Sequence, residues 1–309
     1  MKTIFKFFLI TILLCAGLSH ANNKITIVTP LGVGSAPDRL LRVFAESLSK
    51  KRGVPVVVDN KPGGGGIIAL EYYQRQPADG SFIYMAGGEN VIQSPILYQR
   101  ENLSANLAVV APFITAPLVL FTSSANKSDF TDGLKKNPTF GSWAIGSTGH
   151  VCSIELSSFL QVPSTHIPYK EFGQWLADIA NENVFFGFGS IGSTIGFERS
   201  NRIKYLAVTS KQRLPWFPSL PTVKEKFGVD LEIYQNWVAF FVPNSVPEHI
   251  RTQLENDIRL IQGDPVVRSS FESLYSYQYT ISNREFQRVI ESDRKTFLKF
   301  VKTHNLEIK

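Results

Sequence analysis

A glycine-containing turn at residues 30–38 (Pro-Leu-Gly-Val-Gly-Ser-Ala-Pro-Asp) constrains the fold more than any other feature of the sequence. Residues 24–28 before it are β-branched and apolar like a buried strand, and apolar residues recur at helical spacing over 40–48. Gly32 and Gly34 let the backbone turn and let another group approach closely. The helix start adds unpaired N–H groups and a positive dipole end, so we predict an anion site in an α/β fold. The candidate contacts are Leu31, Gly32, Val33, Gly34 and Asp38.

Two further predicted strands are also followed by glycine-containing turns. Residues 55–58 form the first of these strands, and four consecutive glycines then precede a helical stretch at 67–76. Such a run is costly in chain entropy, which favours close approach of a ligand or of other backbone. It is not a nucleotide-binding loop, because no Gly-Lys-Ser/Thr follows. The next strand, 81–86, ends at residues 87–90, and ligands bind at the carboxyl ends of parallel strands. The candidates here are Gly64, Gly65 and Asn90.

The middle of the chain repeats this arrangement. Residues 138–142 are strand-like, the turn at 143–150 leads into a helix, and a strand at 184–190 ends in Gly-Ser. Ser147 or Thr148 suits the N-cap of that helix, although in a binding turn its hydroxyl can instead face a ligand. Trp143 and Phe188 lie next to these turns, so we expect them to line a pocket. The candidates in this half are Ser142, Ala144, Gly146, Ser147, Thr148, Phe188 and Ser190.

The first 21 residues have the pattern of a cleaved signal peptide. Lys2 and Lys6 precede an apolar run that is too short to span a bilayer, and Ser-His-Ala at 19–21 fits a cleavage site. Removing the two lysines lowers the formal net charge from +6 to +4. This charge is mild, and the sequence has no Lys/Arg stripe of the kind that binds nucleic acid, so we predict no nucleic-acid partner. The signal peptide predicts that the protein is exported.

The length that remains, about 290 residues, exceeds what one core comfortably holds. We predict one lobe from residues 22–122 plus 238–309 and a second lobe from 123–237. Cys152 is the one cysteine after the signal, which excludes an internal disulfide, and the histidines are scattered without ligand spacing. We therefore predict no metal site and no cofactor. Near the end, residues 245–248 and 282–285 have the capping-box pattern that starts a helix.

The chain resembles the Bug family, the extracytoplasmic solute receptors of tripartite tricarboxylate transporters. The matching residues run nearly end to end, and their order and spacing are together specific. They are Pro30, Gly34, Asp38 and Arg42; residues 53–63 and 79–80; Ser-Pro-Ile-Leu-Tyr at 94–98; Ser142 with Gly-Ser-Thr-Gly-His at 146–150; Ile-Pro-Tyr-Lys at 167–170; residues 206–210; Arg213; and Leu-Pro-Thr-Val at 220–223.

The resemblance implies a type II periplasmic binding protein fold, in which two Rossmann-like lobes with a hinge close over a central ligand cleft. It implies a periplasmic receptor, not an enzyme, that captures a small carboxylate-containing organic acid and hands it to the membrane permease subunits of the transporter. It also implies that first-lobe loops hold one carboxyl group through backbone N–H groups and bridging waters, and that the receptor is a monomer.

Three stretches depart from the family pattern. Ser-Ala-Pro at 35–37 replaces part of a glycine run, Glu171-Phe172 follows the Tyr-Lys pair where glycine is usual, and residues 185–190 are aromatic where acidic and amide residues are usual. We therefore expect a second-lobe pocket that is more aromatic and carries the carboxylate of Glu171. Such a pocket fits a monocarboxylate with an apolar or aromatic body, or one with an amine that faces Glu171.

Three questions stay open at this stage. Asp38 can contact the ligand, or it can stabilise the first turn of its helix and hold a bridging water. The closed form can dock on a periplasmic signalling partner instead of a permease. An exported hydrolase using Ser147 and His150 is the third possibility, although the Gly-x-Ser-x-Gly elbow of such enzymes is missing.

Overall fold

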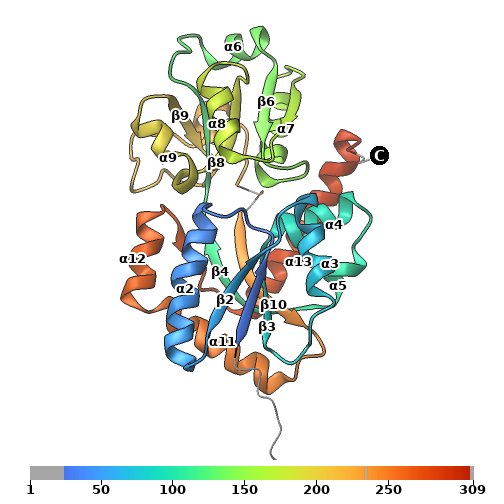
Figure 1. Cartoon of the computed structure of the whole chain (residues 1–309). Coiled ribbons are helices and arrows are strands. Elements are labelled where there is room, and N and C mark those ends of the chain that lie inside the picture. The colour runs from blue at the N-terminus through green and yellow to red at the C-terminus, as the bar shows by residue number, and fades with distance from the viewer. Residues whose placement is uncertain (1–23, 233, 235, 307–309) are drawn as a thin grey trace, which may run out of the picture.

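The computed structural model describes residues 24–306 except 233 and 235, so the predicted signal peptide lies outside the described residues. Two β-sheets, each with helices packed against it, lie one above the other (Figure 1). We call the first sheet with its helices the first lobe and the second sheet with its helices the second lobe. Across these described residues, no helix combines the length and the hydropathy needed to cross a membrane.

The first sheet has the strand order β11-β4-β10-β3-β1-β2. Its strands are β1 (Ile25–Thr29), β2 (Val56–Asn60), β3 (Phe82–Gly87), β4 (Leu107–Thr115), β10 (Trp237–Pro243) and β11 (Tyr277–Gln278). β1 pairs in parallel with both β2 and β3, while β10 pairs antiparallel with β3 and β4. The predicted strands at 24–28, 55–58 and 81–86 are thus confirmed to within a residue or two. Their carboxyl ends share one edge of the sheet.

The second sheet has the order β7-β6-β8-β5-β9. Its strands are β5 (Leu118–Ser123), β6 (Thr139–Ser142), β7 (Thr165–Pro168), β8 (Phe186–Ser190) and β9 (Ile203–Val208). β6 pairs in parallel with β7 and β8, and β5 pairs antiparallel with β8 and β9. The predicted lobe boundary at residue 122 differs from this pairing, because β5 hydrogen-bonds within the second sheet. The chain leaves the first sheet seven residues earlier, after Thr115.

The helices cover the sheets and connect the parallel strands. In the first lobe they are α2 (Ala36–Arg52), α3 (Ile67–Tyr73), α4 (Ser94–Leu97), α5 (Asn102–Ala105), α11 (Glu248–Gln262), α12 (Pro265–Ser273) and α13 (Asn283–His304), with the short turns η2 (Gly64–Gly66) and η3 (Glu89–Gln93). In the second lobe they are α6 (Phe130–Lys136), α7 (Thr148–Phe159), α8 (Phe172–Ala180), α9 (Ile191–Arg199) and α10 (Val223–Phe227).

Local sequence explains where several helices begin and end. α2 starts at the N-cap Ser35 and ends at Gly53 in the left-handed conformation. The capping box predicted at 282–285 forms at the start of α13. The one predicted at 245–248 is wrong: α11 begins after Pro247 with no side-chain cap. The same pattern at 35–38 does start a helix, α2, with Ser35 as N-cap, so the capping pattern alone does not decide where α11 begins.

The chain crosses between the lobes at two places that lie side by side. One crossing joins β4 to β5, and the other leads into β10. The backbone N–H of Ala116 donates to the carbonyl oxygen of Asn236 (3.1 Å), and the Asn236 side-chain amide donates back to the carbonyl oxygen of Ala116 (3.3 Å). Two adjacent connecting segments are the arrangement that a hinge between two rigid lobes requires.

The first-lobe core is built on interlocking aromatic rings. Phe240 on β10 lies 4.8 Å from Phe44 of α2 and 5.0 Å from Phe113 of β4, measured between ring centroids, and all three are fully buried. These contacts fix α2, whose amino end carries the first glycine turn, against the sheet. Packing of this kind explains why the helix can present that turn rigidly.

We predict that Phe240→Ala lowers the free energy of unfolding by about 3–5 kcal/mol, because it removes buried contacts and leaves a cavity. Phe159→Ala is the matched control, since the Phe159 side chain is 52% exposed, and it should cost far less. Urea unfolding of the two variants measures both effects. Equal losses would show that the ring cluster is not central to the core.

Candidate functional site

The carboxyl ends of the parallel strands in the two sheets face each other across the boundary between the lobes (Figure 1). The turn after β1 and the segment after β3 reach this boundary from the first lobe. The turn after β6 and the start of α9 reach it from the second lobe. Hydrogen bonds that join these elements across the boundary, described below, establish that they meet there.

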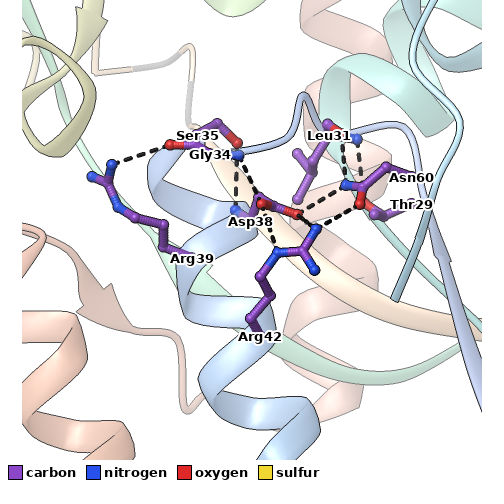
Figure 2. Close-up of polar contacts among 8 residues, drawn as sticks. All are labelled: Thr29, Leu31, Gly34, Ser35, Asp38, Arg39, Arg42 and Asn60. Carbon is purple, nitrogen blue, oxygen red and sulfur yellow. Dashed lines mark hydrogen bonds and ion pairs between the residues drawn. The ribbon is translucent and has the colours of Figure 1, made fainter. Parts of the chain in front are cut away.

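The turn between β1 and α2 is organised by Asp38. This carboxylate is fully buried and accepts hydrogen bonds from the Gly34 N–H (2.8 Å), the Asn60 amide (2.9 Å) and the Arg42 guanidinium (3.1 and 3.2 Å). Figure 2 shows the donors converging on it from the turn, from α2 and from the end of β2. Both oxygens are therefore occupied by groups of the chain itself, which supports the structural alternative for Asp38 over direct ligand contact.

The same turn leaves its tip open. Gly32 and Val33 are exposed, with 74% of Val33 accessible, and Leu31 is half-buried. Gly34 has φ of +80°, a left-handed conformation that L-residues adopt only with strain. The turn also needs Asn60, whose amide donates to the Leu31 carbonyl (3.0 Å) as well as to Asp38 (Figure 2).

The start of α2 touches the start of α9 across the lobe boundary. The Arg39 guanidinium donates both to the carbonyl oxygen of Gly34 (3.1 Å) and to that of Gly192 in the second lobe (2.9 Å). The Ala36 N–H points to the Ser193 hydroxyl at 3.5 Å. Ser190, a predicted ligand contact, stands at the N-cap position of α9 without a side-chain cap, and its hydroxyl donates to that of Ser193 (2.9 Å). These residues form one lobe-to-lobe contact.

The four-glycine turn is approached closely by the protein itself. Gly63, Gly64, Gly65 and Gly66 all have positive φ. A Cβ on Gly66 would lie 2.8 Å from the Asn90 side chain, and one on Gly65 would lie 2.2 Å from the Ser94 hydroxyl. The Asn90 amide donates to the Gly65 carbonyl (3.0 Å) and accepts from the Gly87 N–H (3.1 Å). The sequence predicted that either a ligand or other backbone approaches these glycines closely. In the structure the side chains of Asn90 and Ser94 take this space.

A second lobe-to-lobe contact centres on Glu89, which the sequence reasoning missed. This residue opens η3, directly after β3, and its carboxylate accepts from the Trp143 indole N–H at 3.1 and 3.2 Å. The backbone N–H of Thr148, at the start of α7, donates to it as well. Burial raises the pKa of the Glu89 carboxyl to about 7, against these hydrogen bonds, which lower it. The position of Glu89 between Gly88 and Asn90 was the one available signal.

The turn between β6 and α7 is held by two histidines whose rings lie close together at a tilt. Ser147 is the N-cap of α7, as predicted, and its hydroxyl accepts from the His150 N–H (3.3 Å). The His150 Nδ1 accepts from the Gly146 N–H (3.0 Å), and its ring lies 4.2 Å from that of His166. The Ser142 hydroxyl lies 2.8 Å from the His166 Nε2 and donates to the Ala144 carbonyl. Ser142, Ser147 and Thr148 are all buried.

These contacts do not assemble a hydrolytic triad. The His150 ring faces the Gly146 N–H and not the Ser147 hydroxyl, so the predicted pair lacks the base-to-hydroxyl contact that catalysis needs. The Ser142–His166 pair does have that contact, but Ser142 is fully buried and burial lowers the pKa of His166 to about 4. A weak base beside an inaccessible hydroxyl does not make a nucleophile.

Two predicted pocket residues lie elsewhere. Phe188 is fully buried in the second-lobe core, against Phe186. Glu171 is exposed at the start of α8 and makes no side-chain cap. Trp143 does reach the lobe boundary, and its ring packs edge-on against Trp175. We expected Glu171 to supply a carboxylate to the second-lobe side of the pocket. In the structure Glu89 of the first lobe supplies it, through its contact with Trp143.

A cavity of about 10 Å³ lies between η3 and α13, lined by Gly88, Gln93, Tyr234, Asp293 and neighbouring residues. A larger cavity of about 390 Å³ lies at the opposite edge of the first sheet, beside Arg52 and Asp79. That edge carries the amino end of β1 and the start of α11, opposite the glycine-containing turns at the carboxyl ends of the parallel strands, so we assign the candidate site to the lobe boundary.

Comparison with known proteins agrees with this architecture. A family model described as "Tripartite tricarboxylate transporter family receptor" matches residues 40–306. A UPF0065 protein of Bordetella pertussis is 27% identical over 294 residues, which cover 91% of each chain.

Two solved structures are similar over nearly their whole length. The periplasmic binding protein BugD superposes with a TM-score of 0.82 at 23% identity, covering 93% of this chain and 99% of that one. A Rhodopseudomonas palustris protein solved with adipate has a TM-score of 0.82 at 25% identity, covering 91% and 96%.

We predict that the histidine pair makes stability fall with acid. Burial lowers the pKa of His150 to about 3 and that of His166 to about 4, so between about pH 4 and 6.5 the unfolded chain binds protons that the folded chain does not. Each neutral histidine therefore contributes stability above pH 6.5 that is lost as the pH falls, by up to about 1.4 kcal/mol per pH unit.

His166→Gln should accordingly make unfolding free energy less steep in pH between pH 6.5 and 5, measured by urea unfolding across that range. His249→Gln, at an exposed position, controls for the loss of an imidazole. An identical slope in wild type and His166→Gln would contradict the assignment of His166 as a buried neutral base.

Proposed function

The chain belongs to the tripartite tricarboxylate transporter receptor family, and on that premise we propose that it captures a small organic acid between its two lobes in the periplasm. It would then deliver that acid to the membrane permease subunits of a transporter of this type. The family is one of receptors, and the BugD structure is that of a periplasmic binding protein, so we set the hydrolase alternative aside.

One observation carries the proposal: glycine-containing turns and helix starts of both lobes meet at the carboxyl ends of parallel strands. From the first lobe come the exposed tip at Gly32 and Val33 and the start of α2. From the second come Trp143 and the start of α7. Helix starts attract anions through free N–H groups and the helix dipole. The adipate in the R. palustris structure is an organic acid of the class that such turns suit.

The mechanism we propose is closure about the two adjacent crossings. The Arg39–Gly192 and Glu89–Trp143 contacts join the two lobes, so they must part for the lobes to open and admit an acid. A ligand that bridges the lobes then favours the closed form. A membrane partner that recognises closed lobes would take up the loaded receptor in preference to the open one. We propose that the receptor acts as a monomer.

The test is a thermal-shift screen of the mature protein, unfolded and refolded to remove co-purified ligand, against mono-, di- and tricarboxylic acids. An acid that binds the folded state alone raises the free energy of unfolding by RT ln(1 + [L]/Kd), which is about 2.7 kcal/mol at a hundredfold excess over Kd. The melting temperature rises accordingly. No shift with any acid class, confirmed by calorimetry, would contradict the proposal.

Gly34→Ala should weaken acid binding about tenfold, because its φ of +80° costs an L-residue about 1–2 kcal/mol and the turn would relax to another shape. No atom lies within 4 Å of the added Cβ, so the fold itself should persist. Gly53→Ala is the matched control: Gly53 also has a left-handed φ (+66°) and its Cβ also meets no atom, but it lies at the opposite end of α2 from the turn, so its affinity should stay that of wild type. Equal affinities of the two variants, measured by calorimetry, would remove the β1–α2 turn from the site.

A further inference from the structure

Glu89 places a carboxylate of the first lobe on hydrogen-bond donors of the second. It enters from the end of β3, and it accepts from the Trp143 indole N–H and from the Thr148 N–H at the first residue of α7. This is the environment that a receptor with two helix starts would offer to the far carboxyl group of a bound diacid. The chain supplies that carboxyl group itself.

Most N–H groups around this turn already have partners within it. The Gly146 N–H donates to His150, the Ser147 N–H to the Ala144 carbonyl and the His150 N–H to the Ser147 hydroxyl. Those groups are used inside the turn, while the Thr148 N–H is directed to Glu89. A ligand carboxylate that sought this helix start would therefore compete with Glu89 for the Thr148 and Trp143 donors.

A second negative charge at this place is disfavoured for two reasons. The donors that satisfy Glu89 are neutral, so the site holds one carboxylate without surplus positive charge from them. Two carboxylates brought together in a partly buried site repel strongly. The far end of a ligand is then best uncharged, and Trp143 offers it an apolar ring face.

We propose that Glu89 is a specificity-determining residue, an internal carboxylate that occupies the second-lobe anion position and restricts the receptor to acids with one carboxylate. This inference rests on the proposed function and narrows its substrate class. It assigns the selection to Glu89 at the lobe boundary, where the exposed Glu171 does not reach.

The experiment compares acids of equal carbon number with one or two carboxylates: hexanoate with adipate, butyrate with succinate, and 4-methylbenzoate with terephthalate. Calorimetry on the full mature protein at pH 8, where Glu89 is mainly ionised, gives the ratio of affinities in each pair. Wild type should favour the monoacid. Glu89→Gln keeps an acceptor for Trp143 without the charge, and it should shift the ratio towards the diacid by roughly tenfold or more.

Two further variants make the outcome unambiguous. Glu171→Gln is the matched control and should leave the ratio unchanged, since Glu171 is exposed. Glu89→Ala removes the side chain and should shift the ratio in the same direction as Glu89→Gln. Either variant can therefore test the proposal if the other folds poorly.

If acids bind but the ratio is the same in wild type and both Glu89 variants, or if Glu89→Gln weakens both acids of a pair equally, this proposal is overturned and the proposed function stands. If no acid binds any variant that melts cooperatively, the proposed function fails, and this proposal with it.

Discussion

The buried Asp38 carboxylate is the interaction on which the geometry of the candidate site depends. A charge out of contact with water needs partners, and here they come from three elements: Gly34 in the turn, Arg42 one helical turn further along α2, and Asn60 at the end of β2. The Arg42 side chain is 48% exposed, but Asp38 is buried, so removing a partner leaves the Asp38 charge without compensation. The network therefore locks the strand end, the turn and the helix start in one arrangement.

The same physical device recurs at the other lobe. In each case a glycine-containing turn leads into a helix, and a carboxylate of the chain accepts from an N–H group at that place. Asp38 does so within the first lobe, and Glu89 does so across the boundary with Thr148. The difference matters for function. Asp38 is sealed beneath its turn and stabilises it, whereas Glu89 joins two bodies that must separate when a ligand enters.

The second lobe holds its turn by other means. Two histidines, neutral because burial lowers their pKa values, hold the Gly146 N–H and the Ser142 hydroxyl. Neutral imidazoles leave the helix start without added charge. The charged groups on the contacts between the lobes include Arg199 and Glu155 as well as Glu89 and Arg39.

The sequence by itself determined the strands, the helix starts and the position of the glycine turns, because hydrophobic period, caps and glycine conformations act over a few residues. It placed the first strand at 24–28, within one residue of β1, and the helical stretch at 40–48 lies inside α2; it misplaced the start of α11, which begins two residues later than the capping pattern predicts. The resemblance to the Bug family predicted the two-lobed periplasmic binding protein fold. Only the tertiary structure decided which groups meet at the boundary. Glu89 and Trp143 are 54 residues apart, Phe188 faces the core and Glu171 faces solvent, and no local pattern encodes these directions, because they follow from how two lobes pack against each other.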